Sequence, residues 1–191
     1  LAPTGDTDGS IDDRIYLQQM YDNGLARYDA AIGIHPYGWG NAPDARCCDT
    51  SPERGWDDDP HFFFIETIDE TREIMNRNGD NDAQIWATEF GWAVWEDIGG
   101  ALPEPETSNL WMAYNTLQQQ ADYTIRAFEI AQQRGDMGPM FLWNLNFANE
   151  FTMANRQEII AYSLLFPPRD GSTDIYRRPL FYLLPLTVQG Q

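Results

Sequence analysis

Three short apolar runs recur along the chain, and each of them ends in polar and aromatic residues. They are residues 31–39, 85–92 and 139–146. His35 and Glu89 lie 54 positions apart, and the same 54 positions separate Glu89 from Trp143. Between the runs, apolar residues recur with helical spacing, so strands alternate with helices. This alternation predicts an α/β protein with a parallel sheet and crossover helices.

Helix start and stop signals give approximate bounds for the intervening segments. A capping box at residues 10–13 opens a first helix, which Asn23 and Gly24 end. Asp59 and Pro60 begin a second helix over about residues 60–78, which places His61 on the surface of its first turn. A third helix covers about residues 109–134, and a short final helix begins near Pro179 and stops at Pro185. Residues 1–5 have the pattern of the end of a further strand.

The lengths of the connections indicate how the strands are arranged. Long loops (38–59, 92–108 and 144–178) follow the strands, whereas tight turns precede them. Long loops after the strands favour a TIM barrel, whose active face lies at the carboxyl ends of its strands. A doubly wound open sheet is the alternative, but the sequence has no glycine-rich nucleotide loop. We expect residues 1–191 to be part of one such domain.

Charge and hydropathy exclude two classes of partner. The chain has 30 acidic and 12 basic residues, a formal net charge of −18, and every basic residue is arginine. Such a surface repels phosphate backbones, so we expect no nucleic-acid binding. No apolar run approaches the roughly 20 residues that span a bilayer, so we expect no membrane insertion. The chain starts at Leu1 without methionine, which fits an export signal that was removed or that lies on an upstream part, and we expect an extracellular or secreted protein.

The cysteines are Cys47 and Cys48, which are adjacent in the sequence. Two free thiols are the default expectation, because a disulfide between neighbours is strained. A vicinal disulfide is the alternative. Two cysteines alone cannot complete a zinc site, and the sequence implies neither a metal nor an organic cofactor.

Glu89 is the main candidate for a catalytic group. It lies at the end of an apolar strand run and is followed at once by a glycine turn and Trp92. An apolar strand has no need of a carboxylate at its end, so a functional role is favoured over an ordinary surface acid. Aromatic residues near strand ends suit sugar rings, whose C–H faces pack on aromatic planes.

Five segments in this order resemble the C-terminal half of clan-A glycoside hydrolases, most closely families 5 and 39. They are Ile32-Gly33-Ile34-His35-Pro36-Tyr37, Trp86-Ala87-Thr88-Glu89-Phe90-Gly91-Trp92, Gln120-Ala121-Asp122-Tyr123, Phe141-Leu142-Trp143 and Arg178-Pro179-Leu180-Phe181. The resemblance covers nearly the whole chain. It implies the C-terminal half of a (β/α)8 TIM barrel, from the end of strand 5 to helix 8.

The resemblance also implies roles for individual residues. Glu89 matches the catalytic nucleophile, and His35 and Tyr37 match residues that contact the nucleophile or the sugar. Trp143 matches the tryptophan beneath the sugar at the cleavage point. The nucleophile must stay ionised, so hydrogen-bond donors are expected against it. Further substrate contacts are expected from loop residues that follow the strands, namely Trp39, Trp92 and Asn144.

The chain departs from the family pattern in one large respect. The acid/base glutamate of these enzymes follows strand 4, and no segment here corresponds to strands 1–4. Glu96, Asp97 and Glu150 lie on loops after the strands, but none matches the acid/base position.

We therefore expect a retaining β-glycosidase in which Glu89 is the nucleophile and the acid/base residue comes from elsewhere. The expected partners are a carbohydrate and either the missing N-terminal half or a second copy of the chain. A non-catalytic carbohydrate-binding or scaffold module is the alternative. The sequence leaves the sugar and its linkage open.

Overall fold

A computed structural model describes residues 1–5, 9–48, 58–103, 109–169 and 171–188. Residues 49–57, 104–108 and 170, one stretch in each of the three long predicted loops, lie outside this range. The chain forms two compact units. Unit 1 contains residues 1–90 and 127–141, and unit 2 contains residues 91–126 and 142–191.

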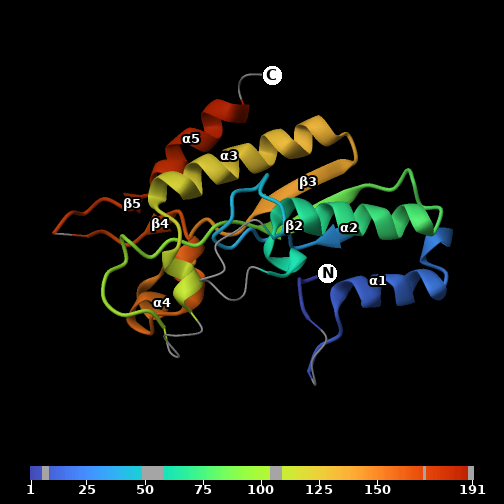
Figure 1. The fold of residues 1–191 in the computed structure, drawn as a ribbon. Helices are drawn as coiled ribbons and strands as arrows, with labels where there is room; N and C mark the ends of the chain where they lie inside the picture. Colours follow the sequence, from blue (N-terminus) through green and yellow to red (C-terminus); the bar gives the residue numbers. More distant parts are fainter. Residues whose placement is uncertain (6–8, 49–57, 104–108, 170, 189–191) are drawn as a thin grey trace. The chain divides into compact units, whose positions relative to one another are not determined.

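Unit 1 is built on a three-stranded parallel sheet in the order β1-β2-β3 (Figure 1). The strands are β1 (Ile32–Ile34), β2 (Ile85–Phe90) and β3 (Met137–Leu142). In the pairing of β1 with β2, Ile32 lies opposite Ile85 and Ile34 opposite Ala87. These four side chains are buried, as expected for apolar strands in a parallel sheet.

The predicted strand at residues 1–5 is reduced to one residue. The amide of His35 donates to the carbonyl of Leu1 at 2.8 Å, and the amino group of Leu1 donates to the carbonyl of Gly33 at 2.6 Å. This is the pattern of a parallel strand pair. Leu1 therefore continues the sheet beyond β1, while the residues after it leave the sheet.

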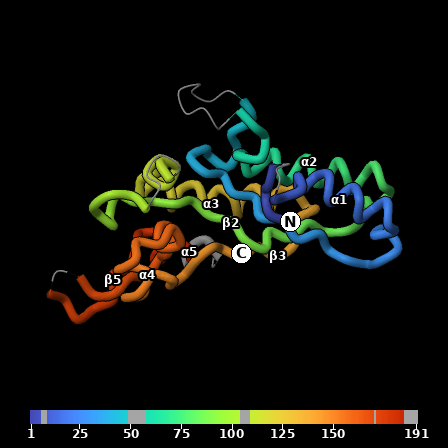
Figure 2. The backbone as a smooth tube through the Cα atoms, turned by 90° about the horizontal axis from the view of Figure 1, so that it is seen from below, coloured from blue at the N-terminus to red at the C-terminus, as the bar shows by residue number. Residues whose placement is uncertain are grey.

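Helices α1 (Asp13–Asp22) and α2 (Phe64–Arg77) pack against each other in unit 1 (Figures 1 and 2). The N-cap of α1 is Asp12, whose carboxylate accepts from the amides of Arg14 and Ile15. A short 3₁₀ helix, η1 (Leu25–Arg27), follows α1, and η2 (Pro60–Phe62) precedes α2. The aromatic ring of Phe90 lies between Phe64 of α2 and Phe128, at centroid distances of 6.1 and 5.2 Å. An aromatic cluster thus joins the sheet to its helices.

Unit 2 contains shorter elements. They are η4 (Leu110–Ala113), the first part of α3 (Leu117–Arg134), α4 (Glu150–Ala154), η5 (Glu158–Tyr162), β4 (Leu165–Phe166), β5 (Tyr176–Arg177) and α5 (Pro179–Val188). Strands β4 and β5 pair antiparallel and form a projecting hairpin (Figures 1 and 2). Helices α3 and α5 share a small core around Ala121, Leu164 and Leu180. The helix α5 continues through Pro185 to Val188, so the predicted stop at this proline is wrong.

A buried arginine organises unit 2. The side chain of Arg178 is fully buried and contacts both carboxylate oxygens of Asp97, at 3.0 and 2.6 Å. It also donates to the carbonyls of Ala161 and Val94, at 2.6 and 2.9 Å. Because a buried charge is tolerated only when it is paired and hydrogen-bonded, these contacts fix three chain segments around one guanidinium.

The predicted (β/α)8 barrel, and with it the assignment of the chain as half of one, is wrong. The described residues contain five strands, three in an open parallel sheet and two in a separate antiparallel pair, and no closed barrel. The βαβ alternation is real, since β1, α2, β2, α3 and β3 follow one another. However, three parallel strands cannot close on themselves, and the segment after β3 forms a hairpin and short helices instead of barrel units.

Within the described residues, no helix is both long and apolar enough to cross a membrane.

Candidate active site

Glu89 lies near the end of β2, and two residues that follow β1 contact its carboxylate. The phenol of Tyr37 donates a hydrogen bond to Oε2 of Glu89 at 3.0 Å. Nδ1 of His35 lies 3.4 Å from the same oxygen. The side chains of His35 and Glu89 remain 26% and 32% exposed, so the group is partly desolvated but open to a ligand.

The parallel register explains why these residues meet. Because Ile34 lies opposite Ala87, the residues that follow each of them emerge at the same edge of the sheet. The hydroxyl of Thr88 donates to the carbonyl of Ile34 at 3.2 Å and holds the two strand ends together. A Cβ atom at Gly33 would lie 3.2 Å from the methyl group of Thr88, so the small residue permits this close packing.

His35 has an altered protonation equilibrium. Burial lowers the pKa of His35, and the neighbouring charge of Glu89 opposes this effect. The imidazole is therefore biased towards its neutral form at neutral pH, although a carboxylate lies beside it. A neutral imidazole can donate one hydrogen bond to Glu89 without forming a full ion pair.

Trp39 belongs to the same loop as Tyr37 in unit 1. It adopts a positive φ of 52° and packs edge-on against Phe62, with ring centroids 5.4 Å apart. Its side chain is only half-buried. Trp39 is therefore held in place by η2 and keeps some exposed aromatic surface.

Trp143 lies in unit 2, immediately after β3. Its ring is half-buried and packs edge-on against Phe147 at 4.9 Å. A Cβ atom at Gly91 would lie 2.5 Å from the carbonyl oxygen of Trp143, a distance that real structures do not allow. The glycine after the Glu89 strand is thus required where the Trp143 backbone approaches. The Trp143–Asn144 peptide bond is cis.

Asn144 and Trp92 have packing roles in unit 2. The side-chain oxygen of Asn144 accepts from the hydroxyl of Ser163 at 2.6 Å and from the amide of Phe147 at 3.2 Å. Its side-chain nitrogen donates to the carbonyl of Ile159 at 3.0 Å. Trp92 is 1% exposed, so its ring offers no surface to a sugar. We therefore assign neither residue to ligand contact.

The acidic residues on the loops of unit 2 also have structural partners. The carboxylate of Glu96 accepts from the amide of Leu117 at 3.2 Å, at the start of α3. Asp97 pairs with the buried Arg178. Glu150 is an exposed residue in the first turn of α4, where a carboxylate interacts favourably with the helix dipole.

Asp12, Asp13 and His61 form a buried cluster that sequence reasoning missed. Each of the three offers one atom with the spacing of metal ligands, all within 4.8 Å of one another. Arg14, however, engages both oxygens of Asp12, through Nε at 3.1 Å and Nη2 at 2.8 Å. A guanidinium already compensates the negative charge, so we assign no metal here. The prediction that His61 lies on the surface is wrong, since this residue is 6% exposed.

The cysteines form the vicinal disulfide, which was the less expected of the two alternatives. Cys47 and Cys48 are joined to each other, and the peptide bond between them is cis.

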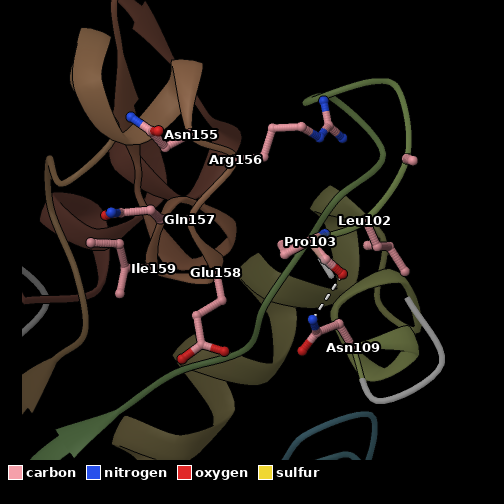
Figure 3. Close-up of a pocket in the computed structure, with 9 residues that line it drawn as sticks. Leu102, Pro103, Asn109, Asn155, Arg156, Gln157, Glu158 and Ile159 are labelled. Atoms are coloured by element: carbon pink, nitrogen blue, oxygen red, sulfur yellow. Dashed lines mark hydrogen bonds between the residues drawn. The ribbon is translucent and has the colours of Figure 1, made fainter. Parts of the chain in front are cut away.

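A pocket of about 870 Å³ lies in unit 2, and no predicted site residue lines it (Figure 3). It is lined by Ala101, Leu102, Pro103, Asn109, Asn155, Arg156, Gln157, Glu158 and Ile159. The side chain of Asn109 donates to the carbonyl of Pro103 at 2.9 Å, and the guanidinium of Arg156 donates to the carbonyl of Gly99 at 2.9 Å. Both contacts hold the wall of the pocket. Arg156, which lines the pocket, has a positive φ of 47°, and nothing in the sequence predicts this backbone conformation.

Neither a protein-family model nor a curated protein sequence matches the chain. The functional argument therefore depends on the residues of the chain.

Proposed function

We propose that the chain supplies the nucleophile of a retaining β-glycoside hydrolase, and that this nucleophile is Glu89. The observation that supports this role is the pair of contacts to Oε2 of Glu89, from the phenol of Tyr37 and from His35. A carboxylate that attacks a sugar must be held in one orientation, and the hydrogen bond from Tyr37, with His35 close to the same oxygen, restricts the orientation of Glu89. The side chain of Glu89 is 32% exposed, so a substrate can reach it.

A retaining mechanism also needs a second carboxyl group, about 5–5.5 Å from the nucleophile. In unit 2 the carboxylates of Glu96 and Asp97 are engaged in structural contacts. In the family that the chain resembles, the acid/base residue follows a strand with no counterpart in this sequence, so we propose that a partner supplies it, either a polypeptide segment outside these 191 residues or a second copy of the chain. The proposed substrate is a β-linked oligo- or polysaccharide. An electrically neutral sugar chain is not repelled by the acidic surface of the protein.

The experiment that tests the proposal is a covalent trap. A 2-deoxy-2-fluoro glycoside with a good leaving group forms a long-lived ester with a nucleophilic carboxylate, because the fluorine slows the second step. We expect mass spectrometry to locate this ester on Glu89, in a preparation whose polypeptides have all been identified by mass. Glu89→Gln should remain unlabelled and inactive while it keeps measurable affinity for the sugar.

The matched control is Glu73→Gln, because Glu73 is an exposed glutamate on α2. This variant should label and turn over substrate like the unaltered protein. Labelling at another carboxylate, or unchanged turnover in Glu89→Gln, would contradict the proposal.

A second candidate function, carbohydrate binding without hydrolysis, is favoured by one observation in unit 2. Phe147, whose ring packs against the half-buried Trp143, is 38% exposed, and Phe151 on α4 is 67% exposed. Exposed rings of this kind suit the apolar faces of sugars. Calorimetric titration with oligosaccharides distinguishes the two functions, since a binding module shows affinity that is unaffected by Glu89→Gln and shows no trapped ester.

A further inference from the structure

The buried His61 has a carboxylate at each ring nitrogen. Nε2 lies 2.7 Å from Oδ1 of Asp13, and Nδ1 lies 2.7 Å from Oδ1 of Asp59. An imidazolium carries a proton on both nitrogens and can donate to both carboxylates at once. In this form His61 joins the N-terminus of α1 to the residue that precedes η2.

Nδ1 of His61 also has a second neighbour, which suits the neutral form of the imidazole. Nη2 of Arg14 lies 3.1 Å from Nδ1 of His61. When Nδ1 has no proton it can accept from this guanidinium, while Nε2 still donates to Asp13. Asp59 then loses the imidazole as a donor and keeps the amide of His61. The two protonation states of His61 therefore use different sets of partners in the same cluster.

The charged groups around His61 favour the protonated form. Asp12, Asp13 and Arg14 face it from the start of α1, Asp59 faces it from the segment before η2, and Glu70 of α2 contacts Arg14 at 3.1 Å. The amino group of Leu1 interacts with the charge of Asp13. The hydrogen bond to Asp13 raises the pKa of His61, although burial opposes this effect. Burial also raises the pKa of Glu70.

Residues 59–62, which contain His61, support the loop that follows β1. Asp59 also accepts from the amide of His61 at 3.0 Å and so caps η2. The carbonyl of Phe62 accepts from the side chain of Asn41 at 2.9 Å, and the ring of Phe62 packs against Trp39. Residues 59–62 thus hold the loop that begins at the Glu89 site.

We propose that His61 is a protonation-dependent clamp. When charged, it binds the carboxylates of Asp13, at the start of α1, and Asp59, before η2, and when neutral it keeps the bond to Asp13 and loses the side-chain bond to Asp59. The clamp is independent of the proposed enzymatic function. Because folding raises the pKa of His61, its stabilising effect is complete below the pKa of the unfolded chain. That effect is lost as the pH rises through the pKa of the folded protein.

The test uses the full chain and its two histidines, His35 and His61. The ring Cε1–H signals are followed by NMR against pH, and His61→Gln assigns them. We expect His61 to titrate above about 6.5, the ordinary histidine value. The melting temperature should fall across this titration by about 3–5 °C for each pKa unit of the shift, and His61→Gln should lack this fall.

Asp59→Asn serves as a second variant, because it keeps the imidazole and Asp13. It should lower the pKa of His61, whereas the neighbouring Asp58→Asn, at an exposed position, should not. Titration of His61 at or below about 6.5 would overturn the clamp, as would identical curves for the two aspartate variants. So would a rise in melting temperature on adding Zn²⁺ that Asp13→Asn abolishes, because it would assign the cluster to a metal.

Discussion

The phenol of Tyr37 donates a hydrogen bond of 3.0 Å to the carboxylate of Glu89, across 52 positions of sequence. The contact joins the end of one parallel strand to the loop that follows its neighbour. It orients one oxygen of a carboxylate whose side chain is 32% exposed. The pair lies at the carboxyl ends of β1 and β2, and it is the basis of the glycosidase site proposed above.

Tyr37→Phe tests the importance of this contact. The change removes the hydroxyl and keeps the ring, so the fold should persist while Glu89 loses a donor. A hydrogen bond to a charged group contributes about 1.5–3 kcal/mol, which corresponds to a loss of about 10–100-fold in kcat/KM if Glu89 is the nucleophile. Initial rates on an aryl β-glycoside measure the effect. Tyr16→Phe, on the exposed face of α1, is the control and should be neutral.

Gly91→Ala should destabilise unit 2. The new methyl group would lie 2.5 Å from the carbonyl oxygen of Trp143, so one of the two backbones must move. Forced overpacking costs about 1–3 kcal/mol. Urea unfolding followed by tryptophan fluorescence measures the loss. Gly5→Ala, where the methyl group meets nothing within 4 Å, should unfold like the unaltered protein, and equal losses in both variants would contradict the argument.

Arg178→Met should reduce stability by about 3–5 kcal/mol, because it leaves the carboxylate of Asp97 buried without its main cation. The double variant Arg178→Met with Asp97→Asn should lose less than the sum of the two single changes. Chemical denaturation of the four proteins gives the coupling. Arg77→Met, at an exposed position of α2, is expected to change stability by no more than about 0.5 kcal/mol. Strict additivity would show that the pair is not coupled.

Asp12 should contribute to stability in a pH-dependent way. The hydrogen bond from Arg14 lowers the pKa of Asp12 to about 2. A lowered pKa gives stability that is complete above the pKa of the unfolded chain, about 3.9, and is lost as the pH falls through about 2. Asp12→Asn keeps an N-capping oxygen but removes the charge.

The difference in melting temperature between the unaltered protein and Asp12→Asn should therefore shrink as the pH is lowered from about 4 to about 2. Asp29→Asn, at an exposed position, is the control and should show no such trend. A difference that stays constant with pH would assign the effect of Asp12 to helix capping alone.

Local structure was largely predictable from the chain. The strands at Ile32 and Ile85 and the helices that end near Arg77 and Arg134 lie close to their predicted positions. Apolar periodicity and helix stop signals are local properties, so they can be recognised without knowledge of the tertiary fold. The same holds for Glu89, because a carboxylate at the end of an apolar strand is visible in the sequence.

The errors came from long-range relations. The prediction of a barrel was wrong because it was based on the lengths of the loops that connect the strands. Closure of a barrel depends instead on the number of strands that pair. Trp92 and Asn144 were expected to face a ligand, but side-chain direction after a strand is set by packing, and both are buried in unit 2. His61 was expected at the surface because a single sequence does not show the carboxylates that surround it.

The sequence by itself determined the alternation of strands and helices, the acidic charge and the position of Glu89 at a strand end, since each depends on neighbouring residues. Only the tertiary structure decided that Tyr37 and His35 meet Glu89, that Arg178 binds two other segments, and that Asp13 and Asp59 share His61. These contacts join residues that are distant in sequence. Their geometry depends on strand register and helix packing, which the free energy of the whole fold sets.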